Sequence, residues 1–338
     1  MTVDRLSIVI CTYNRAGLLR TTLAALGELD PVEQCDIEIV IVDNNSSDNT
    51  RQIIAEAAQK SPFPIRGFHE IKQGKSFALN RALGEARGDV LALTDDDVNP
   101  AHDWAARIVA AFREKPITFV FGKVLPQWAA TPPAELLTKR AQDIWGPLAI
   151  VDYGDEPAAY LPEATGQRLP VGANLSFSRE ALVTIGGWRT DLGKVNNSLI
   201  SGEDHEIFMR LRRHGIYSGW YDPQLTVRHH VPQGRLTRRY FRRWFYWHGR
   251  TQALMLDDLF LNLDMARVPR IAGVPRFLYR QGFQQGKRWM RALGSSDALD
   301  VLIEELHTLQ FAGLYYGCWK RWLRREACSS TLLSTSSS

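Results

Sequence analysis

The stretch 89–97, DVLALTDDD, decides how this sequence can fold, because an apolar run ends there in three consecutive carboxylates. A continuous apolar run of this length is typical of a strand that is buried on both faces. Like charges at the end of such a strand are costly unless a positive group neutralises them. Closely spaced carboxylate oxygens at the carboxyl end of a strand suit Mg²⁺ or Mn²⁺ carrying a substrate phosphate. The alternative is a solvated acidic turn, and this stretch alone does not distinguish the two.

The pattern around this stretch predicts an α/β fold. Strand-like runs occur at 6–11, 37–42, 64–68, 89–94 and 118–124, and helical spacing occurs between them at 16–26, 50–60, 76–86 and 104–112. Continuous apolar strands separated by helices indicate a mostly parallel central sheet with helices on both faces, a Rossmann-like, doubly wound architecture.

The rest of the chain divides into three parts. Residues 126–170 are rich in Pro, Trp and acidic side chains, and we expect a mobile loop region near the site. Regular structure is predicted again at 171–177, 179–185, 203–213 and 225–229. From residue 233 the chain becomes basic, aromatic and helical, and the last ten residues are mostly Ser and Thr. We therefore predict a catalytic domain at 1–232, with a nucleotide-binding half at 1–125 and an acceptor half at 126–232. A helical extension at 233–328 and a disordered tail at 329–338 would follow.

Composition excludes several classes of protein. Hydrophobic residues make up 45% and charged residues 23% of the 338 positions, as in ordinary globular proteins. The four cysteines are far apart and show no CxxC spacing, which argues against a disulfide framework or a zinc site and favours a reducing cytosol. We expect no signal peptide, because the first residues lead straight into a strand. No run reaches the roughly 18 apolar residues of a membrane-spanning helix.

Polar groups follow four of the predicted strands. They are Thr12–Arg15, Asp43–Asp48, Asp95–Asp97 and His229–His230. Any one of them could be a turn or a helix cap, because Asn, Asp and Ser favour both. In a sheet of this kind, however, ligands bind at the carboxyl ends of the strands. The four groups together therefore favour a shared site.

The segments that carry these groups resemble family 2 glycosyltransferases. The similar segments are SIVICTYNRAGLLRTTLAAL (7–26), EIVIVDNNSSDNT (38–50), GKSFALNRALGEARGDVLALTDDDV (74–98) and SGEDHEIFMRLRRHG (201–215). The resemblance covers residues 7–230, in order and with suitable spacing. It implies the nucleotide-diphospho-sugar transferase fold, often called GT-A, and an inverting, metal-dependent transfer of sugar.

The resemblance also implies where the donor nucleotide binds. Thr12, Tyr13 and Asn14 would hold the nucleoside, and Asp43 would accept a hydrogen bond from the base. Lys75 would meet nucleotide phosphate or base at the start of its helix, and the donor would also lie against Asp95 and Asp96.

A metal site is implied by the match to the DxD motif of the family. Asp95 and Asp97 would be the metal ligands, with Asp96 taking part in a shifted register. Family members more often have D-x-D-D here, and Thr94 stands at the first of those positions, which leaves the register open. A late histidine, His229 or His230, would complete the site, and the ion would be Mg²⁺ or Mn²⁺. A structural role for the histidines is the alternative.

Glu203 and Asp204 match the family's ED pair, in which the aspartate is the general base. The chemistry agrees, because an acceptor hydroxyl must lose its proton as it attacks, and this requires a carboxylate apart from the metal. Asp204 follows Gly202 at a predicted helix start, where the helix dipole keeps an aspartate ionised. A plain acidic helix N-terminus is the alternative.

Two further residues resemble family positions near the donor sugar and the acceptor, where Glu203 would also lie. Asn174, in the segment Gly172–Ser176, would bond the sugar, and Trp188, after two glycines, would stack on an acceptor ring. The alternative for Trp188 is packing in the core.

The basic aromatic extension has two interpretations. On a helix over 235–250, one side carries Arg235, Arg238, Arg239, Arg242, Arg243 and Arg250, and the other carries Leu236, Tyr240, Phe241, Trp244, Phe245 and Trp247. Such a helix, with the similar cluster at 319–325, could lie in the headgroups of an anionic membrane. Alternatively, the aromatic side packs on the catalytic domain and the arginines are solvated. No nucleic-acid module accompanies the basic stretch, so nucleic acid is not an expected partner.

The sequence thus predicts an inverting glycosyltransferase that moves a sugar from a UDP- or GDP-sugar to a hydroxyl acceptor, either a sugar or a lipid-linked glycan. The expected setting is bacterial polysaccharide or glycoconjugate synthesis, in the cytoplasm or on the inner face of the plasma membrane. One alternative is a sugar-phosphate nucleotidyltransferase, although such enzymes have a Gly-rich basic loop where this chain has Thr12–Arg15. The other is a non-catalytic nucleotide-sugar-binding protein, which fold alone does not exclude.

Overall fold

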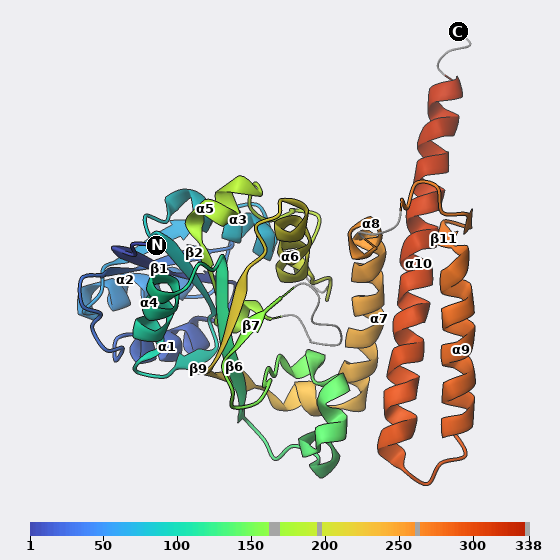
Figure 1. Ribbon diagram of the computed structural model, residues 1–338, viewed down its shortest axis with the longest axis horizontal. Helices are drawn as coiled ribbons and strands as arrows, with labels where there is room; N and C mark the ends of the chain where they lie inside the picture. The colour runs from blue at the N-terminus through green and yellow to red at the C-terminus, as the bar shows by residue number, and fades with distance from the viewer. Residues whose placement is uncertain (162–169, 195–197, 261–263, 335–338) are drawn as a thin grey trace. The chain divides into compact units, whose positions relative to one another are not determined.

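Two compact units make up the computed structural model, which describes residues 1–161, 170–194, 198–260 and 264–334 (Figure 1). The first unit consists of Met1–Ala129, Leu148–Asn197 and Glu203–Pro232. The second consists of Ala130–Pro147, Ser198–Gly202 and Gln233–Ser338. The segments 130–147 and 198–202 thus lie in the second unit, although the sequence predicts them to be part of the catalytic domain.

A mixed sheet forms the centre of the first unit. In the described part of the chain it has nine strands, in the order β3-β2-β1-β4-β8-β6-β9-β5, with β7 paired to β9. The strands are β1 (Arg5–Thr12), β2 (Asp36–Asp43), β3 (Ile65–His69), β4 (Val90–Asp95), β5 (Val98–Pro100), β6 (Phe119–Trp128), β7 (Ala158–Tyr160), β8 (Leu175–Ser178) and β9 (Gly219–Val231). β1 to β4 pair in parallel, whereas β8 runs antiparallel between β4 and β6. The predicted α/β class is confirmed.

The helices of this unit begin and end close to the predicted positions. They are α1 (Ala16–Leu26), α2 (Thr50–Lys60), α3 (Lys75–Glu85), α4 (Trp104–Glu114), α5 (Arg179–Thr184) and α6 (Glu203–Arg213). Each turns an apolar stripe to the core; in α4 the stripe includes the fully buried Ile108 and Phe112. The interior strands β1, β2 and β4 are buried along almost their whole length, which explains their continuous apolar runs.

The strand order places the expected site at a topological switch point. β2 and β4 flank β1, so the chain moves outward from β1 in both directions. In register, Cys11 stands beside Asp95 and Thr12 beside Asp43. The carboxyl ends of the three strands therefore meet at one edge of the sheet, where ligands bind in folds of this type.

The region 126–170 contains more regular structure than its composition indicates. It includes the end of β6, the strand β7, and the 3₁₀ turns η1 (Ala134–Leu137), η2 (Lys139–Ile144) and η3 (Gly146–Leu148). Residues 162–169 lie outside the described part. The strand predicted at 171–177 is divided between the turn η4 (Gly172–Asn174) and β8, and β9 is longer than the predicted 225–229.

The second unit is helical. Its main elements are α7 (Arg238–Leu254), α8 (Leu256–Leu259), α9 (Arg276–Ala292) and α10 (Ala298–Ser334), with a short hairpin of β10 (Arg270–Ile271) and β11 (Val274–Pro275). Within this unit α10 contacts both α7 and α9, as Figure 1 shows. α10 includes 329–334, which the sequence predicts to be part of a disordered tail. The helix continues into these residues because propagation from a packed segment gains a hydrogen bond for each added residue. Residues 335–338 lie outside the described part.

Glycines allow α7 and α10 to approach closely. A Cβ atom on Gly249 would collide with the Gln310 carbonyl, and one on Gly313 would collide with the Tyr246 carbonyl. Phe241 and Phe245 of α7 are buried, and the Phe245 ring packs edge-on against His307 of α10. At least the Phe245 ring of the predicted aromatic side thus takes part in helix packing.

Candidate functional site

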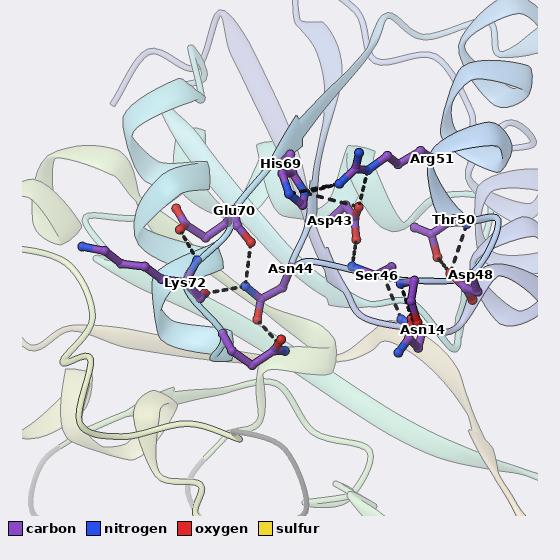
Figure 2. Close-up of polar contacts among 12 residues, drawn as sticks. Asn14, Asp43, Asn44, Ser46, Asp48, Thr50, Arg51, His69, Glu70 and Lys72 are labelled. Carbon is purple, nitrogen blue, oxygen red and sulfur yellow. Dashed lines mark hydrogen bonds and ion pairs between the residues drawn. The ribbon is translucent and has the colours of Figure 1, made fainter.

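Asp43, at the end of β2, lies in a polar cluster that Figure 2 shows. Its side chain is buried, and its Oδ1 accepts a hydrogen bond from the Ser46 N–H at 2.9 Å. Its Oδ2 lies 3.2 Å from Arg51 Nε and 3.5 Å from His69 Nδ1. The carboxylate predicted to accept a bond from the base is therefore held between a turn and a cation.

The adjacent Asn44 holds the loop 70–74 at the same sheet edge through hydrogen bonds (Figure 2). Its Nδ2 donates to the carbonyls of Glu70 and Lys72, at 3.2 and 2.7 Å. Its Oδ1 accepts from the Gly74 N–H at 2.7 Å. Gly74 has a φ of 140°, which an L residue rarely adopts, and the chain enters α3 directly after it. Asn44 thereby fixes the position of Lys75, the first residue of that helix.

The turn after β1 carries both buried and exposed side chains. Thr12 is buried and donates to Asp96 Oδ2 at 2.7 Å, whereas Tyr13 is 41% exposed. Asn14 has a φ of 52° and accepts from the Ser47 N–H at 2.7 Å. Tyr13 is therefore the member of the predicted nucleoside-binding turn whose ring is accessible to a ligand.

Lys75 links carboxylates from two separate segments. Its Nζ lies 3.1 Å from Asp95 Oδ1 and 3.7 Å from Glu203 Oε1. Burial alone would lower the pKa of Lys75, but Asp95, Asp204 and Glu203 hold its pKa well above the ordinary value. Burial would likewise raise the pKa of Asp95, but Lys75 foremost keeps its pKa below the usual range. The two groups form a partly buried ion pair at the carboxyl end of β4.

Arg15 forms ion pairs with the other two carboxylates of the triplet. Its Nη1 lies 2.9 Å from Asp96 Oδ1 and 2.8 Å from Asp97 Oδ2. Burial raises the pKa of Asp96 to about 6, although Arg15 opposes this rise. One cation is thus shared by two buried acids, and their charge is incompletely balanced.

The two histidines at the end of β9 lie on opposite faces of the strand. His229 is buried, and its Nε2 is 3.5 Å from Asp97 Oδ1. His230 follows on the other face, because side chains alternate along a strand, and its backbone N–H donates to the Asp97 carbonyl. Of the two predicted candidates, the structure places His229 beside the triplet.

The arrangement has the donor types that a metal requires. No group of three or more His, Cys, Asp or Glu side chains among the described residues is placed to hold an ion. Asp97 Oδ1, however, is buried and has no hydrogen-bond partner within the described part of the chain. Mg²⁺ typically takes one or two carboxylates from the protein and completes its shell with water and substrate phosphates. The residues therefore fit a metal that shares its shell with a diphosphate.

Asp204 has one oxygen fixed and the other available. Its Oδ2 accepts a hydrogen bond from the Gly172 N–H at 2.9 Å. Its Oδ1 is buried and has no hydrogen-bond partner among the described residues, and the same holds for Glu203 Oε2. Burial, followed by the nearby Asp204 charge, raises the pKa of Glu203. A carboxylate with one oriented and one open oxygen is the form that a general base requires.

Two of the predicted residues are occupied by contacts within the protein. Asn174 accepts from Trp104 Nε1 at 2.8 Å, and its Nδ2 donates to the Lys123 and Leu225 carbonyls. This arrangement favours a structural role over the predicted bond to a sugar. Trp188 is only 3% exposed, and its backbone N–H donates to Asn80 Oδ1 at 2.7 Å, whereas its indole Nε1 has no hydrogen-bond partner among the described residues. Its ring lies in the core, as the alternative interpretation holds.

Four residues of this site received no role of their own from the sequence, although two of them lie in the strand-end groups Thr12–Arg15 and Asp43–Asp48. The four residues are Arg15, Asn44, Arg51 and His69. Arg15 and Asn44 stand inside the quoted segments, so their positions at strand ends were a usable signal. Arg51 and His69 reach Asp43 from α2 and from the end of β3, and nothing in their local sequence marks them.

The chain is similar to known glycosyltransferases. Residues 7–147 match the model described as "Glycosyl transferase family 2". A glucosyl-dolichyl phosphate glucuronosyltransferase of Haloferax volcanii is 21% identical over 256 residues, which cover 74% of this chain and 77% of that protein. A GalNAc(5)-diNAcBac-PP-undecaprenol beta-1,3-glucosyltransferase of Campylobacter jejuni is 33% identical over 97 residues, which cover 28% and 30%.

Solved structures show the same fold. A mannosyltransferase of Pyrobaculum calidifontis, in complex with GDP-Man and Mn²⁺, aligns with a TM-score of 0.52 at 18% identity, covering 99% of this chain and 80% of that one. The TarS fragment 1–349 of S. aureus, in complex with UDP-GlcNAc, aligns with a TM-score of 0.51 at 14% identity, covering 95% and 92%. In the described part of the chain, no helix has both the length and the hydropathy to cross a bilayer.

Proposed function

Since residues 7–147 belong to the family 2 glycosyltransferases, we propose that the protein transfers a sugar, with inversion, from a UDP- or GDP-sugar to a hydroxyl group. The observation that carries this proposal is the state of Asp204. Its Oδ2 is oriented by the Gly172 N–H, and its buried Oδ1 has no hydrogen-bond partner in the described residues. That oxygen is available for the proton of an acceptor hydroxyl. Direct attack by one activated hydroxyl inverts the anomeric centre.

The donor would bind at the carboxyl ends of β1, β2 and β4. The exposed ring of Tyr13 is accessible for stacking on the base, and Asp43 would accept a hydrogen bond from the base in exchange for part of its contact with Arg51. Lys75 is placed to exchange a carboxylate partner for a donor phosphate, as an ammonium on a flexible stem can do.

A divalent ion would be held by Asp97 and His229, with Asp95 nearby on the same strand end. Mg²⁺ or Mn²⁺, when bound, would neutralise charge on the diphosphate leaving group. Arg15 already contacts Asp96 and Asp97, so it would have to share the latter carboxylate with the ion. Because the protein would supply only two ligands, the arrangement favours an ion that binds together with the diphosphate of the donor.

The acceptor would be a sugar or a lipid-linked glycan, in bacterial polysaccharide or glycoconjugate synthesis. Two relatives carry names with a lipid-linked substrate, dolichyl phosphate in one and PP-undecaprenol in the other. A protein with this role would work in the cytoplasm or peripherally on the inner face of the plasma membrane.

A product assay tests the proposal. The full chain is incubated with a panel of UDP- and GDP-sugars, with and without Mn²⁺, and the released products are separated. We expect nucleoside diphosphate, formed only with metal and lost in Asp97→Ala. Release of pyrophosphate from sugar phosphate and nucleoside triphosphate would instead identify a nucleotidyltransferase.

Thermal stabilisation gives an independent reading of the donor site. A ligand that binds only the native state raises the melting temperature. UDP or GDP with Mn²⁺ should raise it for the wild type and not for Asp97→Ala. If no nucleotide raises it and no product forms, the catalytic proposal is wrong.

A further inference from the structure

The outward face of α9 is basic and apolar together. The helix contains five Lys or Arg residues and no Asp or Glu among its 17 residues. Phe283 and Met290 are each 66% exposed, and Tyr279 is 37% exposed. Large apolar side chains at these exposures on one helix are the kind of surface that marks an interaction site.

These apolar side chains lie in one row. At 100° per residue, Tyr279, Phe283 and Met290 fall within about 40° of one another on the helix surface. Arg276, Arg280, Lys287 and Arg291 are exposed and flank this row on one side. The Lys287 Nζ also lies 4.6 Å from the centre of the Phe283 ring. We call this row and its flank the α9 face.

The opposite side of the helix is already used for packing. Leu278 and Gln285 are buried, and Gln285 Nε2 donates to the Glu304 carbonyl and to Glu304 Oε2 on α10. The Tyr315 hydroxyl of α10 donates to the Leu278 carbonyl at 2.8 Å. The helix is therefore held in a fixed rotation. Tyr279, at the edge of the α9 face, also stacks on Tyr315 of α10, whereas Phe283 and Met290 stay exposed.

We infer that the α9 face is a docking surface for an anionic lipid bilayer. The basic side chains would meet the phosphates of the headgroups, and Phe283 and Met290 would enter the boundary with the acyl chains. Helices with this distribution of Lys and Arg beside large apolar side chains lie in the plane of the membrane interface. Attraction to anionic lipid then adds to the free energy of burying the apolar row.

The α9 face is a different surface from the two segments, 235–250 and 319–325, that the sequence predicts to contact a membrane. In α7, Phe241 and Phe245 are buried, and Arg242 pairs with Glu305 at 2.8 Å. In the cluster 319–325, Arg321 donates to the Ala253 carbonyl. Part of the predicted basic aromatic surface thus takes part in packing, although Trp319 and Leu323 are 45% and 41% exposed. On the α9 face, Tyr279 stacks on Tyr315, whereas Phe283 and Met290 are more exposed than either of those two side chains.

Vesicle binding by the full chain tests the inference without nucleotide or acceptor, so its outcome is separate from that of the proposed transferase activity. Co-sedimentation with mixed phosphatidylcholine–phosphatidylglycerol vesicles is compared with pure phosphatidylcholine. The wild type should bind the anionic vesicles at low salt and much less at high salt. Equal binding to both lipids, or no binding, would overturn the inference.

Two double variants separate charge from apolar contact. Lys287→Gln with Arg291→Gln should weaken binding to anionic vesicles about 25-fold, about fivefold for each cation. Phe283→Gln with Met290→Gln should weaken it by about tenfold or more. All four positions are exposed, so the melting temperature should stay unchanged.

Matched controls remove similar side chains elsewhere. Lys60→Gln with Lys139→Gln removes two exposed cations, and Val183→Gln with Leu137→Gln removes two exposed apolar side chains. Both controls should bind like the wild type, and an equal loss in them would overturn the assignment to α9. Sedimentation velocity tests whether a second copy of the chain binds this face instead. If the chain dimerises through Phe283 and Met290 and does not bind vesicles, the face is an interface between copies.

Discussion

A buried carboxylate and a buried group of carboxylates lie at opposite ends of the parallel strands, and they differ in how their oxygens are hydrogen-bonded. At the amino end, Glu38 on β2 accepts hydrogen bonds from Ser7 Oγ at 2.7 Å, from the Arg87 N–H at 2.8 Å and from Arg66 Nη1 at 3.1 Å. Both of its oxygens have partners. At the carboxyl end, buried oxygens of Asp97, Asp204 and Glu203 have no hydrogen-bond partner in the described part of the chain.

The difference separates a structural charge from a functional one. A buried carboxylate is stabilising only where its hydrogen bonds and a counter-charge compensate for the loss of water. Glu38 meets that condition within the protein. The carboxyl-end group meets it in part, through Lys75 and Arg15, and its open oxygens are available to ligands. Under the proposed function, stability is given up there for binding and catalysis, as is typical of active sites.

The largest expected effect comes from removing the proposed base. Asp204→Asn should lower kcat by about 10²- to 10⁴-fold, because an amide does not accept the proton of the acceptor hydroxyl. Donor binding, measured by calorimetry, should remain. Asp36→Asn, an exposed position on β2, is the matched control and should keep full activity. Undiminished turnover of Asp204→Asn would exclude it as the base.

A smaller loss is expected when the base is displaced and not removed. A Cβ atom on Gly172 would lie 2.9 Å from Asp204 Oδ2, so Gly172→Ala should shift the carboxylate. Misplacement of a catalytic group by a fraction of an ångström should lower kcat about 10- to 100-fold. KM for the donor should change little. A variant with normal kcat would show that the Gly172 contact does not orient the base.

At the amino end the effect should be on stability and not on catalysis. Glu38→Gln removes the charge that faces Arg66 and leaves hydrogen bonds poorly matched, and it should lower the free energy of unfolding by about 2 kcal/mol. Urea denaturation measures this loss, and kcat should stay at the wild-type value. A fall in kcat without a loss of stability would contradict the division between the two ends.

The stabilising effect of Glu38 should also depend on pH. Burial alone would raise the pKa of Glu38, but the bonds from Ser7, Arg87 and Arg66 outweigh it and hold the pKa below its usual range. A carboxyl group whose pKa is lowered by folding stabilises the protein above its unfolded pKa, near 4.3, and this contribution is lost as the pH falls through the folded pKa. The difference in stability between wild type and Glu38→Gln should therefore shrink below about pH 4.3. Urea midpoints measured across the acid range test this.

The smallest effect on stability is expected at Asp97. Asp97→Asn removes one of two acids that share Arg15, so the loss of attraction and the relief of repulsion should nearly cancel. The free energy of unfolding should change by less than about 1 kcal/mol. The response to Mn²⁺ should be lost, as seen by thermal stabilisation. A loss as large as that of Glu38→Gln would show that the carboxyl-end group is structural.

Much of this fold and part of the site could be predicted from local sequence. The runs at 6–11, 37–42 and 89–94 correspond to β1, β2 and β4, because buried parallel strands must be apolar on both faces. Once those strands are parallel, their carboxyl ends meet, so Asp43 and Asp95 had to share an edge. The short antiparallel strands β5 and β7 were missed, since three residues carry too little pattern.

The set of elements and the chemistry available at their ends follow from the local sequence, because periodicity and strand-end residues are local properties. Tertiary structure alone decided which atoms meet. It placed His229 and not His230 beside Asp97, through the pairing register of β9 with β5. It also placed Asn174 and Trp188 in the core and Arg51 beside Asp43. These outcomes depend on contacts between residues far apart in the chain, and the side chains that pack against a position decide whether it is buried or open to a ligand.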